Sequence, residues 1–128
     1  MISRLLRSAW PSLAWTVLIF ILLTINTGSI ESVPLMGIKN LDKLVHMFLF
    51  GVLAFLWVCR YQGSGKYSWI WVLVLGAAYG MGMEFYQEHF TTREFELNDI
   101  LADAAGAALG SIMGKKIGPY GNRGRNQN

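Results

Sequence analysis

The feature that most constrains this chain is a set of four apolar segments, each close to twenty residues long. These segments are residues 9–27, 42–59, 69–87 and 97–113. The first contains no charged residue, whereas the fourth is built largely from Ala and Gly around Asp99 and Asp103. Because about 20 mainly apolar residues cross a bilayer as a helix, we predict four membrane-spanning helices over these ranges.

The overall composition favours the same fold class. Of the 128 residues, 53% are hydrophobic and only 15% are charged, whereas a soluble domain carries about 25% charged residues. This excludes a water-soluble globule, and we expect a single all-α domain, an integral membrane four-helix bundle. We expect the first segment to be retained, because it is longer than a signal-peptide core. We expect the polar tail, residues 118–128, to be disordered.

The basic residues are distributed unevenly between the two sides of this four-span topology. The side that holds both chain ends has eight basic residues and no acid: Arg4, Arg7, Arg60, Lys66, Lys115, Lys116, Arg123 and Arg125. The opposite side has only Lys39, Lys43 and Arg93 as bases, together with all eight carboxylates of the chain. Since cytoplasmic loops carry the excess of Lys and Arg, we predict that both termini are cytoplasmic.

Ionisable side chains inside a membrane helix are costly, and they usually mark a functional site that faces the bundle interior. Glycines at spacings of four lie below the carboxylates of the third and fourth predicted helices, and such faces let another helix approach closely. The carboxylates above them should therefore also face inward. Three helices then deliver six polar side chains to one outward-facing pocket: Asp42, His46, Glu84, Gln87, Asp99 and Asp103. Arg93 is the expected counter-ion of the pocket or a clamp for an anionic ligand.

Two interpretations of this polar cluster compete. It can be a hydrogen-bonded network that fixes helix order, but polar contacts between membrane helices contribute only about 0.6–2 kcal/mol each. A purely structural network of several carboxylates and few bases is disfavoured, because like charges repel in a low dielectric and the stabilisation gained is small. A functional pocket is therefore favoured, with His46, Glu84, Asp99 and Asp103 as its catalytic groups. The same four residues can also hold zinc, manganese or magnesium, although their spacing matches no short metal motif.

The order and spacing of these residues resemble those of the VanZ-like membrane proteins. The matching elements are Asp42-Lys43-x-x-His46, Gly80-x-x-x-Glu84-x-x-Gln87, Arg93, Asp99, and Asp103-x-x-Gly106-x-x-x-Gly110, which lie between Leu41 and Gly114. The family often has Asn where this chain has Asp103, so this pocket is more acidic than the usual pattern. The resemblance implies a small multi-span protein of the bacterial cytoplasmic membrane, in a family whose namesake is associated with tolerance to the glycopeptide teicoplanin.

Three functions follow from the pocket and from this resemblance. The first is an envelope enzyme that acts on a lipid-linked cell-wall precursor or a related amphiphile, with Arg93 holding the anionic head group. The second is a binding or protective module that holds such a ligand without reaction. The third is a small proton- or cation-coupled transporter, which the lack of polar groups in the cytoplasmic half disfavours. Asp42, Gln87 and Arg93 are expected to bind ligand, membrane lipids are expected partners, and nothing in the sequence favours nucleic acid.

Overall fold

The computed structural model describes residues 2–25, 41–61, 67–91 and 94–118 of the chain. Over these residues the chain forms five helices and no strand, which confirms the all-α prediction. The helices are α1 (Ile2–Arg7), α2 (Ala9–Thr24), α3 (Leu41–Tyr61), α4 (Ser68–Phe90) and α5 (Leu97–Ile117). The predicted tail lies outside the described residues, apart from Gly118.

The short helix α1 was not predicted, and Pro11 explains why it is separate from α2. In one continuous helix the ring of Pro11 would clash with the carbonyl group of Arg7, four residues earlier. The chain instead breaks at Ser8, whose φ of −71° and ψ of 148° are extended. The Ser8 hydroxyl accepts a hydrogen bond from the Trp10 amide at 3.4 Å and so caps α2. Pro11 then lies in the first turn of α2, where a missing amide costs little.

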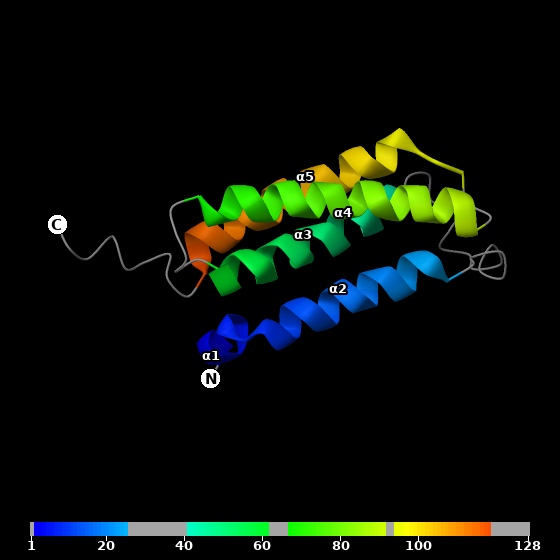
Figure 1. The fold of residues 1–128 in the computed structure, drawn as a ribbon. Helices are drawn as coiled ribbons and strands as arrows, with labels where there is room; N and C mark the ends of the chain where they lie inside the picture. The colour runs from blue at the N-terminus through cyan, green and yellow to red at the C-terminus, as the bar shows by residue number, and fades with distance from the viewer. Residues whose placement is uncertain (1, 26–40, 62–66, 92–93, 119–128) are drawn as a thin grey trace.

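The four long helices run alternately in opposite directions, so α1 and the end of α5 lie at the same end of the molecule (Figure 1). Helices α3 and α5 run parallel and pack most extensively against each other, α4 packs on both, and α2 contacts α3 and α4. The central unit is therefore the α3–α5 pair, which the sequence did not identify.

Glycines on α5 allow its backbone to touch that of α3. A Cβ atom at Gly106 would overlap the carbonyl group of Met47, and one at Gly110 would overlap the carbonyl group of Gly51. One turn further on, a Cβ atom at Gly114 would lie 2.9 Å from the Val58 side chain. This glycine stripe, Gly106, Gly110 and Gly114, is a packing device of the kind that membrane helices use.

The distribution of polar and apolar residues is the reverse of that in a soluble protein. The fully buried polar side chains are Ser12, His46, Glu84, Gln87, Asp99, Asp103 and Ser111. Large apolar side chains are exposed on all four long helices, among them Phe20, Phe48, Trp71 and Leu109. An extended apolar surface of this kind is typical of contact with lipid rather than water.

Two of the described helices, α3 and α4, are long and apolar enough to cross a membrane. Helix α2 is apolar but has only 16 residues, and α5 carries the two carboxylates Asp99 and Asp103 within its first two turns. The structure thus indicates a membrane protein with two candidate spans, and the four-span topology stays a prediction.

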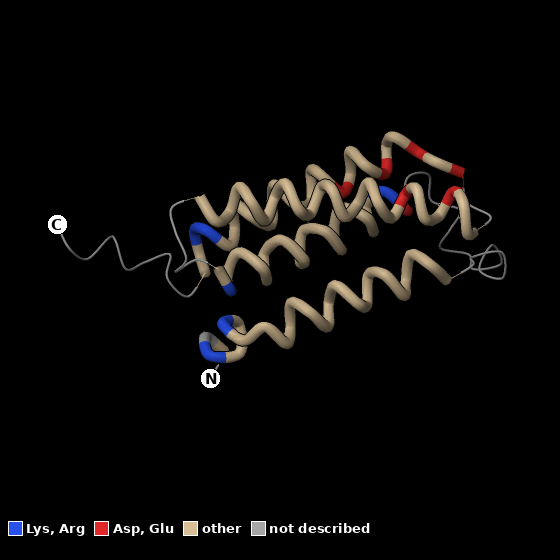
Figure 2. The backbone as a smooth tube through the Cα atoms, in the orientation of Figure 1, with Lys and Arg blue, Asp and Glu red and all other residues tan. Residues whose placement is uncertain are grey.

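Charge separates along the helix axes in the described part of the chain (Figure 2). One end carries the bases Arg4, Arg7, Arg60, Lys115 and Lys116. The other end carries seven carboxylates, Asp42, Glu84, Glu88, Glu94, Glu96, Asp99 and Asp103, with Lys43 as the one described Lys or Arg among them. The molecule therefore has a basic end and an acidic end, and the buried polar cluster lies at the acidic one.

Candidate functional site

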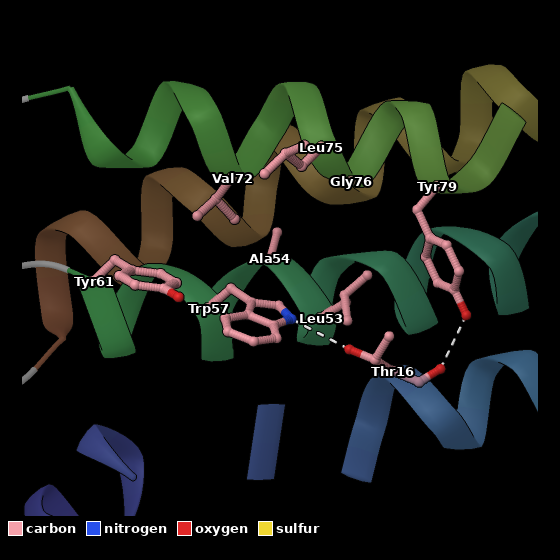
Figure 3. Close-up of a pocket in the computed structure, with 9 residues that line it drawn as sticks. All are labelled: Thr16, Leu53, Ala54, Trp57, Tyr61, Val72, Leu75, Gly76 and Tyr79. Atoms are coloured by element: carbon pink, nitrogen blue, oxygen red, sulfur yellow. Dashed lines mark hydrogen bonds between the residues drawn. The ribbon is translucent and has the colours of Figure 1, made fainter. Parts of the chain in front are cut away.

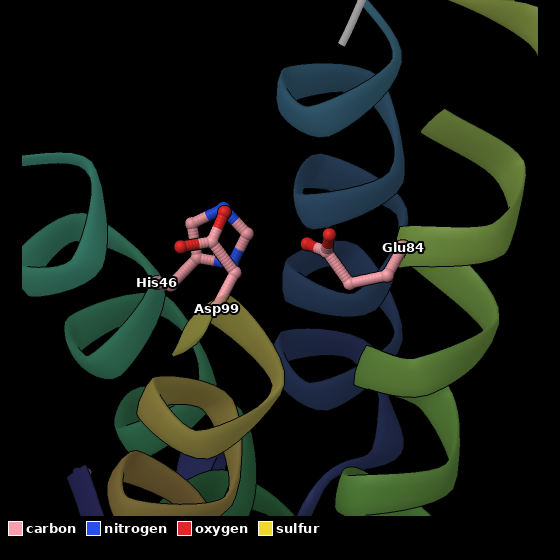
Figure 4. A group of neighbouring side chains, drawn as sticks. All are labelled: His46, Glu84 and Asp99. Atoms are coloured by element: carbon pink, nitrogen blue, oxygen red, sulfur yellow. The ribbon is translucent and has the colours of Figure 1, made fainter. Parts of the chain in front are cut away.

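Three helices meet at the acidic end and bury four ionisable side chains between them. His46 comes from α3, Glu84 from α4, and Asp99 and Asp103 from α5, and each is at most 1% exposed. Glu84 extends from α4 toward His46 and Asp99 (Figure 4). We call these four residues the inner cluster. The structure therefore brings together all four residues that the sequence suggested as catalytic, while their role stays a prediction.

The imidazole of His46 is held between the two aspartates of α5. Its Nδ1 lies 2.9 Å from Oδ1 of Asp103, and its Nε2 lies 3.9 Å from Oδ2 of Asp99. When Asp103 is ionised it can only accept a hydrogen bond, so Nδ1 of His46 carries a proton, and in the neutral ring the lone pair is then on Nε2. The pair therefore turns a basic nitrogen toward Asp99, as in sites where a carboxylate orients a histidine.

A second layer of charges lies outside the inner cluster and is centred on Lys43. Its Nζ atom is 2.7 Å from Oε2 of Glu96, 3.1 Å from Oδ2 of Asp42 and 3.2 Å from Oδ1 of Asp99. Asp99 thus joins the two layers, with one oxygen on Lys43 and the other facing His46. We call Lys43 with Asp42 and Glu96 the outer layer.

Sequence reasoning missed Lys43 and Glu96 as members of the site. Lys43 was counted as a base and as part of the Asp42-Lys43-x-x-His46 element but was given no role in the site, although its position three residues before His46 gives the two side chains neighbouring places on α3. Asp42, predicted to share the pocket with His46, instead lies in the half-exposed outer layer. Glu96 reaches Lys43 from the segment just before α5, and its backbone amide donates to Oε2 of Glu84 at 3.3 Å.

The two other predicted ligand-binding residues have different outcomes. Gln87 is buried, and its Nε2 donates a hydrogen bond to the backbone carbonyl of Leu23 at 2.8 Å. This bond ties α4 to α2 and gives Gln87 a structural task. Arg93, the predicted clamp for an anion, lies outside the described residues.

The floor of the inner cluster depends on Gly80 of α4. A Cβ atom there would lie 2.6 Å from Oδ2 of Asp103 and 2.9 Å from its Cβ. Because Gly80 has no side chain, the Asp103 carboxylate fits between α5 and α4 and can reach His46. Gly80 therefore makes room for the Asp103 side chain, whereas the glycine stripe of α5 brings two backbones together.

An apolar pocket lies further along α3 and α4, between these two helices and α2 (Figure 3). Its volume is about 310 Å³, and its lining residues are Thr16, Leu53, Ala54, Trp57, Tyr61, Val72, Leu75, Gly76 and Tyr79. Thr16 accepts hydrogen bonds from Trp57 at 3.2 Å and from Tyr79 at 3.0 Å, which joins the three helices around the pocket. The buried side chains of Leu49, Phe50 and Met83 separate this pocket from the inner cluster along the chain.

Comparison with known proteins bears on this arrangement. No solved structure matches the chain. The model of the VanZ/LLP1 family, however, matches residues 4–117. The chain belongs to the VanZ/LLP1 family. It is also 33% identical over 97 residues to an uncharacterized protein of Schizosaccharomyces pombe, a match that covers 74% of this chain and 59% of the yeast protein.

The matched region of this VanZ/LLP1 protein includes both layers of the site, which together carry an excess of negative charge. Five carboxylates, those of Asp42, Glu84, Glu96, Asp99 and Asp103, surround one lysine and one histidine. Buried charges are stable only when they are paired, protonated or bound to metal. Lys43 and His46 cannot pair with all five carboxylates, so some of them must be protonated or paired with a further cation.

Proposed function

We propose that this VanZ/LLP1 protein is a multi-pass protein of the bacterial cytoplasmic membrane, with its site at the outer surface. The separation of basic and acidic ends supports this orientation, because the basic end then faces the cytoplasm together with both chain ends. The exposed apolar side chains of the four long helices support a lipid environment.

We further propose that the site binds the polar head group of an amphiphile and acts on it through His46. The observation that carries this proposal is the buried His46–Asp103 pair, with its 2.9 Å contact, at the acidic end of the apolar helices. A histidine whose Nδ1 is held by a carboxylate has a lone pair on Nε2 and is suited to general base catalysis. Asp99 faces this nitrogen at 3.9 Å, and Glu84 lies close to both residues, which completes the reactive set.

The apolar pocket supports an amphiphilic ligand rather than a small polar one. Its volume of about 310 Å³ falls at the lower end of the range for ligand pockets, about 300–1,000 Å³. It shares α3 and α4 with the inner cluster, from which the buried side chains of Leu49, Phe50 and Met83 separate it. A lipid chain in the pocket and a head group at the polar part would therefore be joined around these three side chains.

The family setting suggests the class of ligand. The teicoplanin tolerance associated with the namesake of the family points to lipid-linked cell-wall precursors, because a protein that binds or modifies such a precursor would protect it from the antibiotic. A lipid-linked cell-wall precursor is therefore the first ligand to test.

The test compares His46→Ala with Glu88→Gln, a control that removes an exposed carboxylate from the same end of α4. The proteins are placed in nanodiscs with a synthetic lipid-linked precursor, and bound and converted lipid are measured by mass spectrometry. We expect wild type and the control to convert the precursor, and His46→Ala to be slower by about 10²–10⁴-fold.

Two results would count against this assignment. Precursor that binds to wild type without conversion would identify a non-catalytic module and remove His46 as a base. Precursor that does not bind to wild type at all would exclude this class of ligand.

A further inference from the structure

We infer that the inner cluster is a binding site for one divalent transition-metal ion, with His46 Nε2, Glu84 and Asp99 as its ligands. The inference rests on protein atoms alone. It gives the Nε2 lone pair of His46 to the ion, so with metal bound His46 would not act as the base, while binding of an amphiphile at the site is unaffected. Zn²⁺ and Mn²⁺ are the ions that this set of one imidazole and two carboxylates suits best.

The distances between the three side chains fit a common ion. One ligand atom from each of His46, Glu84 and Asp99 lies within 4.8 Å of the other two (Figure 4). Three ligand atoms that share one ion at bond lengths of about 2.0–2.2 Å lie about 3.3–3.8 Å from one another. Side-chain rotations that bring the ligand atoms closer by up to about 1.5 Å therefore close the site.

Asp103 supplies the second, independent indication of a metal. In protein metal sites the nitrogen of a ligating histidine that does not bind the ion usually donates to a carboxylate, which fixes the ring and its tautomer. Asp103 Oδ1 does this for Nδ1 of His46 at 2.9 Å. Its other oxygen, Oδ2, is buried and has no hydrogen-bond partner among the described residues. The aspartate is thus placed to orient the histidine as the carboxylate partner of a metal ligand does.

The charges around the cluster also favour a cation at this place rather than in the outer layer. A second group of carboxylates, Asp42, Glu96 and Asp99, also has oxygens within 4.8 Å of one another. The ammonium group of Lys43 already lies among these three, at 2.7–3.2 Å. Lys43 therefore already supplies positive charge to the outer layer, and the remaining negative charge belongs to the inner cluster.

The ligand types distinguish between ions. Ca²⁺ needs six to eight oxygen ligands and Mg²⁺ keeps most of its waters, whereas a buried imidazole nitrogen is a good ligand for Zn²⁺ and the two carboxylates are good ligands for Mn²⁺. We therefore expect Zn²⁺ and Mn²⁺ to bind well, and Mg²⁺ and Ca²⁺ to bind much more weakly.

The experiment titrates chelator-treated, detergent-purified protein with ZnCl₂ or MnCl₂ in a calorimeter, with no amphiphile present. We expect one equivalent of metal in wild type and in Glu88→Gln, and a loss of affinity of more than about 100-fold in His46→Gln, Glu84→Gln and Asp99→Asn. Asp103→Asn, which leaves the three ligands in place, should lose about 10–100-fold.

A spectroscopic measurement on wild type keeps the test independent of how the variants fold. Pulsed electron paramagnetic resonance of the Mn²⁺-loaded protein should show coupling to one imidazole nitrogen. Wild-type protein that binds well below one equivalent, Mn²⁺ without nitrogen coupling, or equal losses in Glu84→Gln and Glu88→Gln would each overturn the inference. Because precursor binding is measured separately, a failed metal test leaves the proposed function standing, and the reverse also holds.

Discussion

Replacement of Gly110 by alanine should lower the free energy of unfolding by about 3 kcal/mol, the upper end of the cost of overpacking. The added methyl group would overlap the carbonyl group of Gly51 on α3. Neither backbone can rotate away as a side chain can, so α3 and α5 would have to separate along their whole contact. Unfolding of the detergent-solubilised protein, followed by circular dichroism, measures the change.

Gly82→Ala is the matched control for this prediction. A Cβ atom at Gly82 meets nothing within 4 Å, and alanine favours a helix over glycine by up to about 1 kcal/mol. We therefore expect Gly82→Ala to be neutral or slightly stabilising. Equal stability of the Gly110→Ala and Gly82→Ala proteins would show that α3 and α5 do not pack as described.

Replacement of Lys43 by methionine should cost about 2–3 kcal/mol of stability. The loss of one member of a buried ion pair leaves the other charge uncompensated, which costs about 3–5 kcal/mol when both are fully buried. The Asp99 side chain is 1% exposed but that of Lys43 is 23% exposed, so water offsets part of the loss. The same unfolding measurement applies, and Lys116→Met, which removes an exposed lysine at the basic end, should change little.

A double variant shows whether the loss comes from the carboxylates around Lys43. Asp99→Asn removes one of the three acidic partners, so Lys43→Met combined with Asp99→Asn should be more stable than the sum of the two single changes. Strict additivity would mean that Lys43 stabilises the protein by packing alone, and the outer layer would then have no electrostatic role.

The sequence was sufficient to predict the helical segments and which of their faces are buried. Long apolar stretches gave the positions of α2 to α5 to within a few residues, because only a helix satisfies the backbone of such a stretch in lipid. The glycine spacings correctly predicted the burial of Glu84, Asp99 and Asp103. Helix α5 extends to Ile117, beyond the predicted end at residue 113, since Lys115 and Lys116 can continue a helix outside the apolar layer.

The pairing of helices and the ionic contacts could not be predicted from one sequence. A glycine stripe shows that some helix approaches closely, but not that α3 and α5 form this parallel pair. Glu96, which binds Lys43, lies 53 residues further along the chain, and only the three-dimensional arrangement brings the two residues together. The structural role of Gln87 could not be predicted for the same reason, because its hydrogen bond to Leu23 depends on how α2 lies against α4. The six-residue helix α1 is too short to show a hydrophobic period.

We propose that the inner cluster serves a ligand and is not needed to hold the helices together. The most direct test is thermal unfolding of Glu84→Gln in the presence of a chelator. If Glu84 is ionised, the change removes repulsion from Asp99 and Asp103, and if it is protonated, glutamine has nearly the same shape. In both cases we predict a midpoint equal to that of wild type or higher, whereas Gln87→Leu, one turn along α4, should lose about 1 kcal/mol with its hydrogen bond. A midpoint for Glu84→Gln that falls as far as that of Gln87→Leu, or further, would contradict the claim and make the cluster part of the structural core.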